Sequence, residues 1–256
     1  MDITSFSHES IMKGLDSARK ESVTKGTGVR VLFSPKRITE QNFNEVCSIY
    51  ATISEDDFDT VVIIESHPGS AEKKLPMPSF KYLDTQFGRV HANDRLRNDF
   101  ADEDDDFFIN DDAFDENLSL QHQLLMLQSV LNDFSVLSIQ ITDENSFIIK
   151  ELAFAIEEIL ASKNALVVCC CDMEQGKIDE LRKVVDSVVS GNMSAVLNYL
   201  NSDISKVDGV GTFITGLMVA KKWDLSIEFP AITDVKGKMI SPIYGYAALQ
   251  RQSILN

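Results

Sequence analysis

The sequence has no apolar run that approaches the roughly 18 residues needed to span a membrane. Its N-terminal stretch, MDITSFSHES, also lacks the basic and then apolar pattern of a signal peptide. We therefore expect a cytoplasmic protein. Basic residues are scarce, because 24 Lys and Arg stand against 40 Asp and Glu, which gives a formal net charge of -16. Such a charge would repel a nucleic-acid backbone or an anionic membrane at long range, so neither is expected as a partner.

Cysteine is scarce as well. The 4 cysteines are Cys47 and the consecutive Cys169, Cys170 and Cys171. Three adjacent cysteines at the end of an apolar run match neither a zinc knuckle nor a disulfide framework, because adjacent strand residues point to opposite faces. We interpret them as small buried hydrophobic side chains. A nucleophilic Cys171 is the less favoured alternative, since no base lies near it in the sequence.

The rest of the composition is that of a globular protein, with 44% hydrophobic and 25% charged residues over 256 positions. The clearest strand is Val-Val-Ile-Ile at residues 61–64, which is apolar on both faces. It is followed by Ser66, His67 and the turn-forming Pro-Gly pair. Ligands bind at the carboxyl ends of strands in open α/β sheets, so His67 is a candidate for chemistry.

Short apolar runs alternate with stretches of helical period along the chain, which predicts a single α/β domain over residues 1–256. We expect three α/β/α layers with a mostly parallel central sheet, because residues 29–64 form a strand, helix and strand joined by short links. Strands are predicted over residues 29–33, 60–64, 135–141, 165–171, 225–229 and 243–249, with a turn near Gly88 and a loop over 172–176. Helices are predicted over residues 9–20, 40–53, 118–131, 145–160, 178–189, 192–200 and 212–222.

A strongly acidic stretch lies between residues 94 and 114, and we interpret about 99–116 as a solvated loop. The ligand spacing of an EF-hand, with its glycine and its terminal glutamate, is absent. A calcium site is therefore not predicted there.

Several loop segments resemble, in the right order, the motifs of the Memo family, which includes protein B of the AmmeMemoRadiSam system. This family is related to the LigB-type class III extradiol dioxygenases. Phe-Ser-Pro-Lys at residues 33–36 is similar to the family's apolar-Ala-Pro-His loop. Ile-Glu-Ser-His at residues 64–67 is similar to its Gly-Pro-Ser-His loop, and residues 85–90 are similar to its Thr-Pro-Leu-Gly-x-Val segment.

The likeness continues downstream and covers about residues 29–249. Residues 117–124 are similar to the family's Glu-His-Ser-Leu-Glu-x-x-Leu helix, and residues 167–175 to its strand followed by Ser-Ser-Asp-x-x-His. Asp208-Gly209 falls near the family's Cys-Gly pair. Residues 244–248 match its closing Ser-Tyr-Ala-Ala-Gly strand. The resemblance implies a LigB-like α/β fold.

The departures from the family fall on polar positions, while the apolar framework is kept. Lys36, Leu118 and Gln175 stand where the family has His, Gln121 stands where it has Glu, Asp208 stands near its Cys, and His67, Ser119 and Asp172 retain the family residue. A non-haem iron site takes two imidazoles and a carboxylate. An ammonium at one ligand position has no lone pair to offer and would repel a cation. We therefore predict no cofactor, and keep iron or zinc at His67, Asp172 and Asp208 as the alternative.

The same comparison defines a candidate ligand cleft at the carboxyl ends of the strands. Its expected residues are Lys36, Ser66, His67, Ser119, Gln121, Asp172, Gln175 and Asp208. His67 and Asp172 are the catalytic candidates within it. We also expect Asp172 to form an ion pair with Lys36, because both follow strand ends.

The leading functional hypothesis is a Memo-like protein whose metal site has degenerated and whose cleft binds a small molecule or a protein partner without turnover. One alternative is a working metal-dependent oxidoreductase or hydrolase with a site rearranged around His67. Another is an adaptor that uses its acidic loop to meet a basic partner. The sequence leaves the oligomeric state open.

Overall fold

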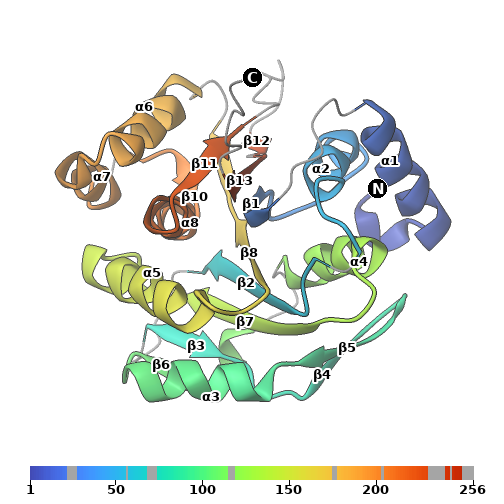
Figure 1. Ribbon diagram of the computed structural model, residues 1–256, viewed down its shortest axis with the longest axis horizontal. Helices are drawn as coiled ribbons and strands as arrows, with labels where there is room; N and C mark the ends of the chain where they lie inside the picture. The colour runs from blue at the N-terminus through green and yellow to red at the C-terminus, as the bar shows by residue number, and fades with distance from the viewer. Residues whose placement is uncertain are drawn as a thin grey trace, which may run out of the picture.

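A mostly parallel sheet lies at the centre of the computed structural model (Figure 1). The structure describes residues 1–21, 28–55, 57–67, 74–114, 119–174, 178–202, 205–229, 240–242 and 244–249. The central strands are β1 (Val29–Ser34), β2 (Thr60–Ser66), β4 (Tyr82–Thr85), β5 (Gly88–Ala92), β7 (Ser135–Ile141), β8 (Ala165–Cys170), β11 (Leu225–Glu228) and β13 (Gly245–Leu249).

These strands lie in the order β11-β13-β1-β8-β2-β7-β5-β4. The neighbours from β1 to β5 in that order pair in parallel. Antiparallel pairing joins β13 to β1, β11 to β13 and β4 to β5. The predicted mostly parallel sheet is confirmed. The first two predicted strands, β1 and β2, do not pair with each other, because β8 lies between them.

Helices cover both faces of the sheet, which confirms the three predicted layers (Figure 1). One face carries α3 (Asp94–Glu103), α5 (Ser146–Leu160), α6 (Ile178–Val189), α7 (Met193–Leu200) and α8 (Val210–Lys222), and the other carries α1 (His8–Glu21), α2 (Phe43–Tyr50) and α4 (Leu120–Val130), preceded by a 3-10 turn η1 (Ile3–Ser5). Val62 and Ile64 pack in the first core, while Val61 and Ile63 pack in the second. Alternate residues of β2 thus point to opposite faces, and both faces are apolar.

The described residues of the acidic stretch, 94–114, are folded, so their interpretation as a solvated loop is wrong, and residues 115 and 116 lie outside the described part of the chain. The stretch forms α3, β6 (Phe107–Ile109) and the 3-10 turn η2 (Asp111–Ala113), and β6 pairs in parallel with β3 (Leu75–Met77). Leu96, Phe100 and Phe107 are buried between the acidic residues. Their burial offsets the entropic cost of ordering the segment. The interpretation as a loop considers only the density of charge and not this amphipathic pattern.

The predicted loop over residues 172–176 is also wrong for residues 172–174, while residues 175 and 176 lie outside the described part of the chain. The segment contains β9 (Asp172–Glu174), the middle strand of a small sheet with β10 (Val207–Asp208) and β12 (Ile240–Pro242). Met173 and Val207 are paired and buried, which stabilises this sheet beyond the end of β8. None of the described helices has the length and apolar character needed to cross a membrane.

Candidate functional site

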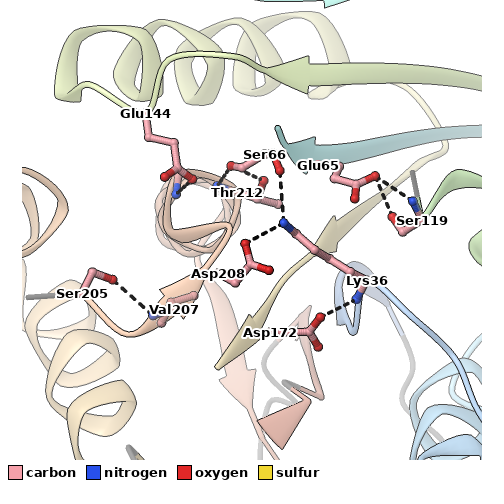
Figure 2. Close-up of polar contacts among 11 residues, drawn as sticks. Lys36, Glu65, Ser66, Ser119, Glu144, Asp172, Ser205, Val207, Asp208 and Thr212 are labelled. Atoms are coloured by element: carbon pink, nitrogen blue, oxygen red, sulfur yellow. Dashed lines mark hydrogen bonds and ion pairs between the residues drawn. The ribbon is translucent and has the colours of Figure 1, made fainter. Parts of the chain in front are cut away.

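Polar residues from four separate segments meet at the carboxyl edge of the sheet (Figure 2). We call Lys36, Glu65, Ser66, Asp172 and Asp208 the Lys36 site. Lys36 follows β1, Glu65 and Ser66 end β2, Asp172 opens β9, and Asp208 ends β10 just before α8. The parallel strands β1, β2 and β8 end at the same edge, and β9, which follows β8 there, pairs with β10 and places Asp172 opposite Asp208. These positions therefore converge although they are far apart in the sequence.

Lys36 is the centre of this group. Its Nζ donates to Asp208 Oδ1 at 2.8 Å and to the Ser66 carbonyl oxygen at 3.2 Å. Its side chain is 17% exposed, whereas that of Asp208 is 62% exposed. Burial alone would lower the pKa of Lys36, but the hydrogen bond and the charge of Asp208 leave that pKa above its ordinary value. Lys36 is therefore an ammonium ion.

The expected ion pair between Lys36 and Asp172 is not the one formed. Asp172 Oδ2 accepts a hydrogen bond from the backbone N–H of Lys36 at 3.3 Å, while the ammonium pairs with Asp208. Burial raises the pKa of Asp172 to about 7, and the nearby charge of Asp208 adds to this effect. Asp172 thus exchanges its proton near neutral pH.

The turn at Gly209 brings Asp208 against Lys36. Gly209 has a φ of +82°, a conformation that L side chains rarely adopt. An added Cβ would lie 3.1 Å from the carbonyl oxygen of Cys170 and 3.4 Å from Cε of Lys36. Both the backbone conformation and the close approach therefore favour glycine at this position.

On the side of the Lys36 site next to α8, the first residues of the helix are hydrogen-bonded to neighbouring side chains. Thr212 donates its backbone N–H to Ser66 Oγ at 3.2 Å, and the two hydroxyl oxygens lie 3.0 Å apart. The backbone N–H of Gly211 donates to Glu144 Oε1 at 2.8 Å. Protein side chains thus occupy amide donors in the first turn of α8, which a helix would otherwise offer to an anion.

On the other side of the Lys36 site, next to α4, lies the buried carboxyl group of Glu65. Glu65 Oε2 accepts from both the backbone N–H and the hydroxyl of Ser119, each at 2.9 Å. Burial raises the pKa of Glu65, although the Ser119 bonds and the charges of Lys36 and His67 oppose this. The loop after β1 is held against α4, because Gln123 Nε2 donates to the Pro35 carbonyl at 2.9 Å.

The other predicted residues have different placements. His67 is exposed one residue beyond β2, and its backbone N–H donates to the Ile141 carbonyl at 2.9 Å. Gln121 is directed to the β4–β5 hairpin, where its Nε2 lies 3.4 Å from the Asp84 carbonyl, so it is not part of the Lys36 site. Leu118 and Gln175 lie outside the described residues. The cysteines are buried and burial raises the pKa of Cys171, in agreement with a packing role.

The donor set at the Lys36 site does not fit the metal centre that the resemblance implies. In the described part of the chain, no group of three His, Cys, Asp or Glu side chains is arranged to hold a metal ion. The ammonium of Lys36 has three donors and no acceptor. It already supplies the positive charge that a cation would bring to Asp208.

Comparison with known proteins identifies the family of this chain. The family model described as "Memo-like protein" matches residues 7–241. The chain belongs to the Memo-like family. No curated protein matches this Memo-like chain. The crystal structure of an uncharacterized protein, JW3007 from Escherichia coli K12, is similar in fold, with a TM-score of 0.54 and 12% sequence identity over 86% of this chain and 99% of that one.

The sequence analysis missed Glu65 in the Lys36 site, and it also missed Gln123 and Glu144, which bind the segments beside the site. Glu65 carried a visible signal, since a carboxylate at the end of an all-apolar strand needs a partner when it is buried. The other two lie on segments whose approach to the site depends on tertiary packing. The sequence alone held no signal for that approach.

Proposed function

We propose that this Memo-like protein binds a small, neutral, polar ligand at the Lys36 site without a metal ion and without turnover. The observation that carries the proposal is the 2.8 Å ion pair between Lys36 and Asp208. It puts an internal cation where the family resemblance implies a metal ligand. The scaffold is retained, while the electrostatic role of the metal is taken over by a side chain.

The charges at the site favour a neutral ligand. The ammonium of Lys36 is balanced by Asp208. Asp172 and Glu65 both have raised pKa values because of burial, so each can hold a proton and donate a hydrogen bond more readily than an ordinary carboxyl group. An anion would meet these carboxyl groups and the overall charge of -16. A cation would compete with Lys36 for Asp208.

The first experiment tests the metal. Purified protein is analysed for bound metals and titrated by calorimetry with ferrous iron, zinc and copper, beside a Lys36→His variant. We expect no stoichiometric binding to the wild-type site, because the ammonium repels a divalent cation. Tight binding of one metal ion per chain that is lost on substitution of His67 or Asp208 would contradict the proposal.

The second experiment tests the ligand class with acetamide and acetate, which have the same size and differ in charge. Nuclear magnetic resonance of the ¹⁵N-labelled protein should show saturable shifts at Lys36, His67 and Asp208 with acetamide. A Lys36→Met variant should lose these shifts. Stronger binding of acetate, or shifts that persist unchanged in Lys36→Met, would contradict a neutral-ligand site at Lys36.

A second candidate function is a working enzyme with a rearranged site, and the pKa of about 7 at Asp172 favours it. A general acid or base is most effective when its pKa lies near the working pH. Hydrolysis of a nitrophenyl ester that follows an ionisation near pH 7 and falls by about tenfold or more in Asp172→Asn would support this function. Equal rates in both proteins would exclude Asp172 from such a reaction.

A further inference from the structure

A pocket of about 410 Å³ lies at the opposite edge of the sheet from the Lys36 site. It is bounded by the start of β2, the first half of α3 and the loop between α5 and β8. Its lining residues are Asp59, Thr60, Asn93, Arg95, Leu96, Asp99, Ser162, Lys163 and Asn164. Leu96 is the one hydrophobic member of this set, and the volume is that of a small-metabolite site.

Two of the four charged groups in this pocket neutralise each other. Lys163 Nζ lies 3.2 Å from Asp99 Oδ2, and this pair links the α5–β8 loop to α3. Asp99 is the residue four positions after Arg95, the place from which a helical neighbour would pair with that guanidinium. Asp99 pairs with Lys163 and forms no ion pair with Arg95.

Arg95 is left without an ion pair in the described part of the chain. Asp94, the residue directly before Arg95, pairs with Arg97 at 2.8 Å. Arg95 is exposed to solvent, so its guanidinium is open to a ligand. It presents a planar set of donors that matches a carboxylate in two parallel hydrogen bonds.

The second uncompensated charge is Asp59, which enters the pocket from the start of β2. Its Oδ1 accepts from the hydroxyl of Thr60 at 2.8 Å, and no ion pair to it is formed by the described residues. One positive and one negative group, on different elements, therefore remain for a ligand. Asn164 adds an amide that can both donate and accept.

We propose that this pocket binds a small zwitterion of the α-amino acid class, with its carboxylate on Arg95 and its ammonium on Asp59. Charge complementarity carries the assignment, since a ligand with one charge of each sign pairs both groups and adds no net charge. Asn164 and Ser162, which also line the pocket, are the polar groups left for the ligand side chain. This site is independent of the function proposed for the Lys36 site.

The test uses the full chain and the protein L-amino acids, each added singly to ¹⁵N-labelled protein at millimolar concentration. We expect at least one of them to give saturable shifts at Asn93, Arg95 and Asn164. For that amino acid, the analogue without the carboxylate and the analogue without the amino group should each bind about tenfold more weakly, which is the loss of one charged contact.

Matched variants separate the pocket from general charge effects. Arg95→Met and Asp59→Asn should each weaken binding by about tenfold, whereas Arg19→Met, which makes the same charge change on α1, should leave it unchanged. Asn can still accept from Thr60, so the fold around residue 59 is kept. The proposal is overturned if no amino acid shifts these signals, or if Arg95→Met binds as well as the wild type.

Discussion

The two edges of the central sheet differ in how fully their charged groups are paired within the protein. At the carboxyl edge, Lys36 is paired with Asp208, and Glu65 accepts two hydrogen bonds from Ser119. At the amino edge, the pocket leaves Arg95 without an ion pair among the described residues. The carboxyl edge is where the fold places its ligands, yet in this chain its polar groups stabilise one another. Substitutions that leave one member of these pairs without its partner at the carboxyl edge should therefore cost stability, and substitutions at the amino edge should cost little.

The largest expected effect is the pH dependence caused by Asp172. Its pKa is about 7 in the folded protein against 3.8 ordinarily, so the folded state binds the proton more tightly than the unfolded state. By linkage, the free energy of unfolding falls as pH rises from about 4 to about 7. One pKa unit is worth about 1.4 kcal/mol, so the whole window amounts to on the order of 4 kcal/mol.

Asp172→Asn removes this titration and keeps an oxygen that accepts from the Lys36 backbone. Urea unfolding at pH 5, 6, 7 and 8 should show the wild type losing stability relative to the variant as pH rises. Glu65 titrates in both proteins, so the difference between them isolates Asp172. A constant difference across this range would mean that Asp172 is not a buried, proton-binding carboxyl group.

The next effect compares two fully buried glutamines near the carboxyl edge. Gln123 accepts from the Tyr50 hydroxyl at 2.6 Å and donates to the Pro35 carbonyl, whereas neither side-chain amide atom of Gln140, on β7, has a hydrogen-bond partner among the described residues. Gln123→Met should lower the free energy of unfolding by about 3 kcal/mol, because it leaves two buried polar groups unpaired.

Gln140→Met is the matched control, since it removes an amide that makes no hydrogen bond in the described structure. It should leave stability unchanged or raise it. Urea unfolding of both variants gives the comparison directly. Equal losses in the two variants would show that Gln140 has a partner of its own in solution.

A third test uses two glycines with left-handed backbones. Gly209 has a φ of +82° and lies against Cys170 and Lys36, whereas Gly191 has a φ of +76° with no described atom within 4 Å of an added Cβ. Gly191→Ala should cost about 1 kcal/mol from backbone strain alone. Gly209→Ala should cost about 2 kcal/mol, because the Cβ also meets the Cys170 carbonyl. Equal losses would show that the turn at Gly209 relaxes away from Lys36.

The fold was more predictable from the sequence than the site. Runs such as residues 61–64 and 165–171 are apolar on both faces, and that pattern permits little other than a central strand. The high charge density of the acidic stretch favours a loop, although Leu96 and Phe100 give it a buried apolar face. The sequence marks both Lys36 and Asp208 as departures from the family's pattern. Which carboxylate would meet the ammonium depended on the turn at Gly209 and on the pairing of β9 with β10, and neither is a local property.

The smallest expected effect lies at the amino edge and tests the comparison from its other side. The pair between Lys163 and Asp99 has side chains 35% and 36% exposed, so solvent screens much of its attraction. Lys163→Met should change the free energy of unfolding by less than about 1 kcal/mol. It should also free Asp99 to pair with Arg95, four residues before it on α3. The variant would then keep its stability and lose affinity for a carboxylate at Arg95, so unfolding and ligand binding would respond separately. A large loss of stability would mean that the pair holds the α5–β8 loop in place, and that both edges of the sheet depend on internal pairing.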